Sequence, residues 1–271
     1  MKIVSFNING LNAFDSKGNL EKIINSTNAD IYCFQEIKIS EKKVDKMNNI
    51  FSKFPNYIAY NNICTSKQGY AGVSILVNTN IKDRVLNVTY PNILDNKLFE
   101  SYKHQGNGRV ITIEFDTFCL VNAYVVNSGN KQAERHAFDL MMIDYINSLN
   151  KPCIYCGDMN VCATQLDYWG NYEYAKNSSP GLYEFEINDF ALLLNNCKLI
   201  DTYRYKNGNK KEYSWYSPIS NKTNPAYKLR HGWRIDYFLV SDSIKDNVEY
   251  SKIYEGWNQI DHSPIEIEIQ L

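Results

Sequence analysis

Hydrophobic residues recur at two different spacings along the chain, and this predicts strands that alternate with helices. Residues 2–8 and 30–34 read as strands, and apolar residues recur at helical spacing between 20 and 27. Ser40 and Glu41 then resemble the start of a second helix with one apolar side. The chain is therefore expected to open as strand, helix, strand.

The middle of the chain predicts a meander of strands followed by a long helix. Residues 72–77, 109–115 and 118–125 read as strands, and the last two are joined by a tight turn at 116–117. Residues 133–149 carry two neighbouring apolar rows at helical spacing, which is typical of a helix with one face on a core.

A second round of strands and helices completes the chain. Residues 152–156, 235–240 and 265–271 read as strands, and residues 186–195 as a helix. The last strand alternates Ile with Glu or Gln, which predicts one core face and one open face. This order favours two β/α halves packed sheet to sheet, with helices on the outer faces.

Length and composition indicate one ordinary folded domain over residues 1–271. Hydrophobic residues make up 44% of the chain and charged residues 22%, and no linker interrupts them, so disorder is a poor interpretation. The first apolar stretch is too short for a signal peptide and lacks a small-residue cleavage site. No stretch approaches the roughly 20 apolar residues of a membrane span. We expect an intracellular protein that does not enter a membrane.

Seven cysteines, several of them inside apolar runs, are typical of reduced and buried thiols. Cys153 and Cys156 form a CxxC motif, but the residues between them belong to a predicted strand. A second CxxC or a His pair does not follow, so a zinc site is disfavoured.

The net charge of −1 gives no general electrostatic argument for nucleic acid binding. Basic residues nevertheless gather late in the chain, at Arg204, Lys206, Lys210, Lys211, Lys222, Lys228, Arg230 and Arg234. Aromatic residues interleave with them, at Tyr203, Tyr205, Tyr213, Trp215, Tyr216, Tyr227 and Trp233. Two interpretations stay open for this stretch, namely contact with phosphates and bases or a solvated loop region.

Polar side chains stand where the apolar runs stop. Residues two apart on a strand share a face, so Asp158 and Asn160 point the same way, and Asn7 and Asn9 repeat that spacing. A carboxylate beside a carboxamide can orient a water and hold a phosphate oxygen. Glu36 supplies the hard oxygen that Mg²⁺ or Mn²⁺ prefers.

One such residue is more often a turn cap than a functional group. Five at strand ends favour a metal-dependent site that cleaves phosphodiesters; they are Asn7, Glu36, Tyr124, Asp158 and Asn160. His262 follows Asp261, and a buried carboxylate such as Asp236 could fix its tautomer and keep it cationic. A cationic His would stabilise a crowded phosphorane.

Seven motifs together resemble, in order and spacing, the exonuclease III/AP endonuclease family of the endonuclease/exonuclease/phosphatase superfamily. The resemblance spans the whole chain. The motifs are Phe6-Asn7-Ile8-Asn9-Gly10, Phe34-Gln35-Glu36-Ile37-Lys38, Gly108-Arg109-Val110, Asn122-Ala123-Tyr124-Val125-Val126-Asn127, Cys156-Gly157-Asp158-Met159-Asn160-Val161, Gly232-Trp233-Arg234-Ile235-Asp236-Tyr237 and Asp261-His262-Ser263-Pro264.

The resemblance implies a four-layer α/β sandwich, with two mixed β-sheets packed face to face and helices outside. It also implies Mg²⁺-dependent cleavage, with Mn²⁺ as a substitute, on the 5′ side of an abasic site in double-stranded DNA. The product would carry a 3′-hydroxyl, and some 3′→5′ exonuclease or 3′-end-cleaning activity is expected. The protein would act as a monomer wherever the DNA is.

The resemblance also assigns roles to single residues. For the metal, Glu36 resembles the ligand, Asn7 and Asn9 its neighbours, and Asp261 a residue close to it. For the chemistry, Asp158 would activate the attacking water, and His262 would stabilise the transition state with Asp236 as its orienting partner. For the substrate, Tyr124, Asn160 and Asn127 resemble phosphate-holding groups, and Trp215 and Trp233 match positions that line the pocket for a flipped abasic sugar.

The chain departs from the family pattern in three places. Many members carry Asp where this chain has Asn9, and Val126 replaces the usual Pro. Residues 128–132 are few and lack the arginines that some members insert into the duplex. Two alternatives stay open: a phosphatase or phospholipase acting on inositol phosphates or sphingomyelin, and a non-catalytic nucleic-acid-binding relative.

Overall fold

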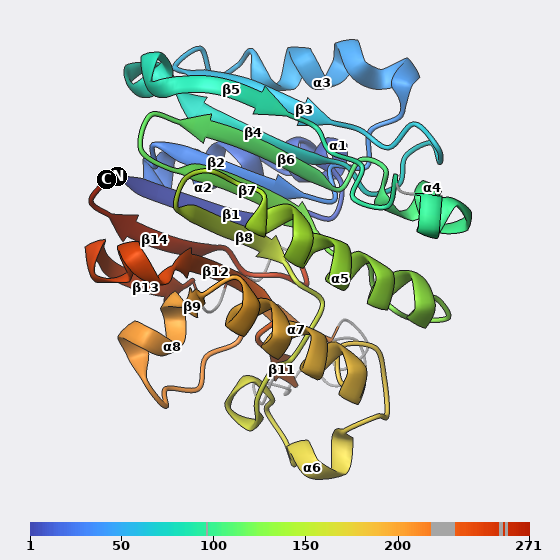
Figure 1. Ribbon diagram of the computed structural model, residues 1–271. Helices are drawn as coiled ribbons and strands as arrows, with labels where there is room; N and C mark the ends of the chain where they lie inside the picture. The colour runs from blue at the N-terminus through green and yellow to red at the C-terminus, as the bar shows by residue number, and fades with distance from the viewer. Residues whose placement is uncertain (96, 218–230, 255–256, 258–259) are drawn as a thin grey trace.

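Two six-stranded mixed sheets lie face to face in the computed structural model, which describes residues 1–95, 97–217, 231–254, 257 and 260–271 (Figure 1). The first sheet has the order β13-β14-β1-β2-β4-β3. Its strands are β1 (Lys2–Asn7), β2 (Ile31–Gln35), β3 (Tyr57–Asn62), β4 (Val73–Asn78), β13 (Val248–Ile253) and β14 (Ile265–Ile269).

The second sheet has the order β5-β6-β7-β8-β12-β9. Its strands are β5 (Val85–Thr89), β6 (Val110–Phe115), β7 (Cys119–Tyr124), β8 (Cys153–Asp158), β9 (Leu199–Asp201) and β12 (Asp236–Ser241). A short two-stranded ribbon, β10 (Trp215–Tyr216) with β11 (Gly232–Trp233), stands apart from both sheets.

Helices cover the outer face of each sheet, which completes four layers and confirms the predicted α/β sandwich (Figure 1). The first sheet packs against α1 (Leu11–Ser16), α2 (Asn19–Thr27) and α3 (Val44–Phe51). The second packs against α5 (Gln132–Asn147) and α7 (Glu184–Asn196). Short helices fill connections, at α4 (Lys103–Gly106), α6 (Tyr172–Ala175) and α8 (Thr202–Asn207).

Both faces of the central strands are buried, because one face meets the other sheet and the opposite face meets helices. On β1, Ile3 belongs to the core between the sheets, whereas Val4 belongs to the core under α1 and α2. The same alternation places Cys153 and Cys156 of β8 in different cores. The CxxC thiols therefore point to opposite faces and cannot share a zinc ion, and all seven cysteines are free.

The expected open face of the last strand is wrong at Glu266, although Glu268 is partly exposed and Gln270 is exposed. Glu266 on β14 is fully buried, although it points away from the core between the sheets. Its carboxylate accepts hydrogen bonds from the hydroxyls of Tyr250 and Tyr254 at 2.6 and 2.7 Å, and Lys252 pairs with it at 2.9 Å. These residues belong to β13 and its end, and β13 was not predicted. An alternating pattern cannot tell solvent from a polar neighbour, because both suit Glu.

Strand pairing brings the predicted polar residues to one edge. β1 and β2 run parallel and pair Asn7 with Gln35, next to Glu36. β7 and β8 run parallel and pair Tyr124 with Asp158, and antiparallel β12 places Asp236 opposite Asp158. None of the described helices is long and apolar enough to cross a membrane.

Candidate active site

A cavity of about 470 Å³ opens at this edge of the two sheets. Nine of the twelve predicted site residues line it: Glu36, Tyr124, Asn127, Asp158, Asn160, Trp215, Trp233, Asp261 and His262. The other three, Asn7, Asn9 and Asp236, hydrogen-bond to lining residues. The structure thus brings together all twelve predicted site residues.

Asp158 lies at the end of β8 and is almost fully buried. Its Oδ1 accepts the backbone N–H of Asn160 at 2.9 Å, and its Oδ2 accepts the amide of Asn7 at 2.9 Å. Burial raises the pKa of Asp158 to about 7; the His262 ring opposes this rise and the Asp236 carboxylate adds to it. A carboxylate with a pKa near the working pH suits a general base.

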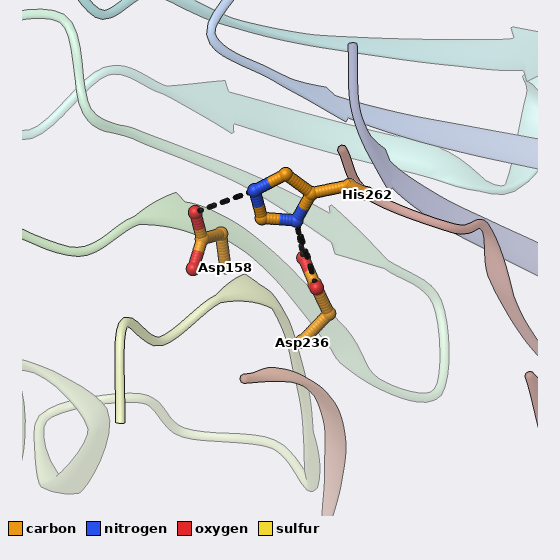
Figure 2. Close-up of side chains that lie close together, drawn as sticks. All are labelled: Asp158, Asp236 and His262. Carbon is orange, nitrogen blue, oxygen red and sulfur yellow. Dashed lines mark hydrogen bonds and ion pairs between the residues drawn. The ribbon is translucent and has the colours of Figure 1, made fainter. Parts of the chain in front are cut away.

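His262 stands between two carboxylates (Figure 2). Its Nδ1 hydrogen-bonds to Asp236 Oδ2 at 2.9 Å, and its Nε2 lies 3.8 Å from Asp158 Oδ2. Burial alone would lower the pKa of His262, but the carboxylates of Asp236 and Asp158 outweigh it and raise this pKa to about 10. The ring is therefore cationic at neutral pH, with Nε2 directed towards Asp158.

Asn7 joins the two sheets. Its side-chain nitrogen donates to Glu36 Oε1 and to Asp158 Oδ2, both at 2.9 Å, while its oxygen accepts the backbone N–H of Asn9. Turning the amide over would set its oxygen against two carboxylates, so the hydrogen-bond network fixes this orientation. Asn7 therefore presents hydrogens, and not its oxygen, to the acidic residues.

Glu36 is held ionised at the end of β2. Burial opposes this, but the Lys38 ammonium, at 2.5 Å from Oε2, and the Asn7 amide lower the pKa of Glu36 below its usual value. The same ammonium donates to Asn9 Oδ1 at 2.6 Å. Two of the oxygens assigned to a metal therefore already attract a cation.

Asn9 connects Glu36 and Lys38 to Asp261. Its amide nitrogen donates to Asp261 Oδ1 at 3.2 Å, and the indole N–H of Trp215 donates to Asp261 Oδ2 at 3.4 Å. Asn9, Glu36, Lys38 and Asn160 all have positive φ, between 47° and 53°. Non-glycine residues adopt this conformation at a cost and cluster at functional sites when they do.

The oxygen donors fit a hard divalent cation. Glu36, Asn9 and Asp261 offer carboxylate and amide oxygens, as Mg²⁺ and Mn²⁺ prefer. A second group could also hold a metal, because the ligand atoms of Asp158, Asp236 and His262 all lie within 4.8 Å of one another. In that group, however, each carboxylate is already engaged by the cationic His262 ring or by an amide.

Three polar groups stand beside Asp158. Asn127 donates to Asn160 Oδ1 at 3.1 Å, and Asn160 donates to the Val125 carbonyl at 2.9 Å, so each amide nitrogen keeps a second hydrogen. Burial and the Glu36 carboxylate raise the pKa of Tyr124 well above its usual value, although Arg109 opposes them. Tyr124 therefore keeps its hydroxyl proton as a donor.

Two indole rings form the apolar wall of the cavity. Trp215 and Trp233 are cross-strand partners in the β10–β11 ribbon, and their rings meet edge to face with centroids 5.3 Å apart. Gly181 closes the wall because it lies against Trp233: a Cβ at this position would stand 3.1 Å from the indole, and φ there is +87°. Ile235 lines the same wall.

The late basic stretch is in part structural. Arg234 is buried and pairs with Asp167 and Asp201 at 2.7 and 2.6 Å, and Arg204 also pairs with Asp167. These two arginines hold the chain together and offer no free charge to phosphate. Of the other basic residues named from the sequence, Lys206, Lys210 and Lys211 are exposed, whereas Lys222, Lys228 and Arg230 lie outside the described residues, as does Tyr227.

The sequence did not point to Ser214, and it named Lys38 only as the last residue of a motif, without a role. The Ser214 hydroxyl accepts hydrogen bonds from the backbone N–H groups of Ile235 and Asp236 at 3.1 and 3.0 Å. The backbone carbonyl of Ser214 accepts one from the backbone N–H of Ser263 at 2.6 Å. Ser214 thus sets Asp236 and the segment after His262 in one position. A lone Ser gives no signal for this, whereas Lys38 follows Glu36 by two residues and could have been noticed.

An α/β sandwich with a buried Asp-His-Asp group beside a third carboxylate, that of Glu36, indicates a class of phosphoester-hydrolysing proteins. The sequence matches the model of the Endonuclease/Exonuclease/phosphatase family over residues 4–256. The chain belongs to this family, which confirms the resemblance of its motifs.

Relatives carry the similarity over the full chain. A Bacillus subtilis (strain 168) protein named exodeoxyribonuclease is 30% identical over 277 residues, which cover 100% of both chains. A Dictyostelium discoideum protein named DNA-(apurinic or apyrimidinic site) endonuclease is 30% identical over 280 residues, covering 100% of this chain and 71% of the relative.

Solved structures share the fold. The AP endonuclease LMAP from Leishmania major has a TM-score of 0.84 at 22% identity, covering 100% of this chain and 87% of its own. An AP endonuclease from Archaeoglobus fulgidus has a TM-score of 0.80 at 18% identity, with 100% of both chains covered. At these identities the likeness shows a common fold.

Proposed function

We propose that this protein is a Mg²⁺-dependent DNA-repair nuclease. It hydrolyses the phosphodiester on the 5′ side of an abasic site in double-stranded DNA and leaves a 3′-hydroxyl. Some 3′→5′ exonuclease or 3′-end-cleaning activity accompanies this incision, and Mn²⁺ replaces Mg²⁺. The names of the full-length relatives support this choice of substrate.

The observation that carries the proposal is the convergence of three different groups on one cavity. A buried carboxylate with a raised pKa, a cationic histidine and two indole walls all line the same 470 Å³. The first two suit attack on a phosphorus centre by water. The third suits an apolar sugar without a base, which has less stacking to lose on leaving the duplex than an intact nucleotide.

The side chains divide the work of hydrolysis. Asp158 takes the proton of the attacking water, and the water lies between it and the phosphorus atom. His262 donates from Nε2 to the phosphoryl oxygen on which charge develops, while Asp236 holds the ring protonated at Nδ1. The remaining amide hydrogens of Asn127 and Asn160, with the Tyr124 hydroxyl, position the other phosphate oxygens.

Mg²⁺ would be held by Glu36, with Asn9 and Asp261 nearby, and when bound it neutralises phosphate charge and polarises the scissile group. Asn7 orients Glu36 and Asp158 through its two N–H groups. Lys38 would have to release Glu36 and Asn9 as the divalent cation arrives, and its half-exposed side chain leaves it free to move.

The test is a duplex that carries one tetrahydrofuran abasic analogue, incubated with the protein and Mg²⁺. This analogue cannot undergo β-elimination, so a cut requires hydrolysis. We expect a single product whose 3′-hydroxyl a polymerase can extend, with loss of cutting in EDTA and in Asp158→Asn. If the abasic duplex stays uncut, and the protein instead releases phosphate from inositol phosphates or phosphocholine from sphingomyelin, the other superfamily functions are supported.

A further inference from the structure

A buried arginine lies behind the cavity and is bonded to the segments that form it. Arg135 on α5 is 1% exposed, and its guanidinium donates to three backbone carbonyls. Nη1 reaches Val126 at 2.9 Å and Asn160 at 3.1 Å, and Nη2 reaches Met159 at 2.9 Å. The first carbonyl directly precedes Asn127, and the other two belong to the turn that carries Asn160.

Glu186 on α7 extends this connection to the opposite wall. It is fully buried, and its Oε1 lies 3.6 Å from Arg135 Nη1. Its Oε2 accepts the backbone N–H groups of Gly181 and Tyr183 at 2.7 and 3.1 Å. Gly181 packs on Trp233 and lines the cavity. One ion pair is thus bonded to three lining segments that are far apart in sequence.

The two helices give this pair a rigid base. α5 and α7 lie side by side over the second sheet (Figure 1). Arg135 Nε also donates to Asp139 Oδ2 at 2.5 Å, one helical turn further along α5. The guanidinium therefore uses Nε and both terminal nitrogens, and its plane is fixed.

We infer that Arg135 and Glu186 are positioning residues for the reaction: together they fix Asn127, Asn160 and Gly181 at the spacing that the scissile phosphate and the sugar require. This inference rests on the proposed function for its activity readout. Neither side chain lines the cavity, so each acts through the backbone it binds. A displacement of about 1 Å in such groups lowers a rate by about 10²-fold.

The alternative is that the Arg135–Glu186 ion pair only stabilises the fold. Breaking a buried ion pair is costly wherever it lies, so a loss of activity alone would not separate the two roles. The pair differs from an ordinary core contact in one respect that can be measured: its loss should loosen three lining segments together while the core between the sheets stays unchanged.

The experiment compares wild type with Arg135→Lys, Glu186→Gln and the control Ile113→Ala. Lysine keeps the charge but cannot reach three carbonyls, and glutamine keeps an acceptor for Gly181 while losing the attraction to Arg135. Ile113 lies in the core between the sheets and its substitution destabilises the protein elsewhere. Steady-state kcat and KM on the abasic duplex are measured well below the lowest melting temperature, together with hydrogen exchange of residues 125–129, 159–162 and 179–183.

We expect kcat to fall by about 10²-fold in Arg135→Lys, faster exchange in all three segments, and near-normal kcat in Ile113→Ala. An unchanged kcat, or exchange that stays at the wild-type rate in these segments, would overturn the inference. If Arg135→Lys does not fold, Glu186→Gln decides by the same criteria. A folded wild-type protein that cuts no abasic DNA would refute the proposed function. The hydrogen exchange of the variants, compared with that of wild type, would still decide the inference.

Discussion

His262 Nε2 lies 3.8 Å from Asp158 Oδ2, which is too far for a hydrogen bond and close enough for one substrate oxygen to contact both. A cation and a carboxylate that form an ion pair would normally approach to hydrogen-bond distance. Here Asp236 holds the other side of the ring, and Asn7 and Asn160 hold the carboxylate. These partners therefore hold the gap between the proposed acid, His262, and the proposed base, Asp158.

Replacing the base should separate binding from catalysis. Asp158→Asn removes water activation and should slow incision by about 10²–10⁴-fold, because general-base catalysis contributes that much. Binding of an abasic duplex should persist, since the substitution removes a negative charge from the phosphate site. Single-turnover rates and gel-shift affinities measure the two effects. Normal cutting by Asp158→Asn would show that another group is the base.

Replacing the metal ligand should give a defect that metal can repair. Glu36→Ala should lose incision at low Mg²⁺ and regain part of it at high Mg²⁺ or with Mn²⁺, because only the affinity for the cation is weakened. Metal titration calorimetry on the protein without DNA provides an independent reading. Equal metal affinity in wild type and variant would place the cation elsewhere.

Replacing Asp236, the partner of His262, should make the imidazole ring lose its proton and become neutral. In Asp236→Asn the pKa of His262 should fall from about 10 towards the usual range, because the Asp236 carboxylate is the largest favourable influence on it. Incision at pH 8 should then drop much further than at pH 6, where the ring regains its proton. The imidazole NMR shifts against pH give the pKa directly. An identical titration in both proteins would contradict the assigned pairing.

Opening the sugar pocket should change substrate choice. Wild type should cut an abasic duplex far faster than it releases nucleotides from a 3′ end. Trp233→Ser enlarges the cavity beside Gly181 and should admit nucleotides that keep their base. The ratio of abasic incision to single-nucleotide release, at one Mg²⁺ concentration, is the measurement. The two indole rings would not determine selectivity if the substitution left this ratio unchanged, or if nucleotide release were already faster than abasic incision in wild type.

The Arg135 neighbourhood should give stability an unusual pH dependence. Burial raises the pKa of Asp139 to about 7; the Arg135 guanidinium opposes this, and Asp189 and Glu186 add to it. The folded state thus keeps a proton that the unfolded chain releases above pH 4, so stability should fall as pH rises from about 4 to 7. The contribution is on the order of 2–4 kcal/mol.

Thermal melts at pH 5 and pH 8 test this linkage. Wild type should melt at the lower temperature at pH 8, and Asp139→Asn should narrow the difference because it cannot ionise. His136→Gln provides a control: His136 is a neighbouring residue of α5 that is half exposed and pairs with Asp189. If the melting temperature of Asp139→Asn changes between pH 5 and pH 8 as much as that of wild type, the pH dependence of stability comes from another group.

Strand-end reasoning predicted which residues meet at the candidate site, because chain geometry determines where strand ends lie. Asp158 and Asn160 share a face whenever the strand is regular, and Glu36 must lie at the same edge if β1 and β2 run parallel. The four-layer architecture followed from the family motifs and from buried strands that read as apolar runs. Both inferences depend on local periodicity, which a single sequence contains.

Other features depend on contacts that no local pattern records. Arg135 with Asp139 is spaced like an ordinary surface pair on a helix, so its burial and its carbonyl partners were invisible. β3 and β5 were missed because their segments are only partly buried and lack a clean alternation. For Arg234, charge in the sequence suggested phosphate, whereas Asp167 and Asp201 from other segments neutralise it.

Asn7 belongs to the first sheet, and the two carboxylates that it bridges belong to different sheets: Glu36 follows β2, and Asp158 ends β8. A shift of one sheet over the other by a single pleat would break one of these 2.9 Å bonds and separate the proposed metal ligand from the proposed base. Incision should therefore report on how the two sheets are docked, and it should disappear when one sheet shifts over the other, even if each sheet keeps its own hydrogen bonds. A fragment holding one sheet alone would contain half of the chemistry and perform none of it.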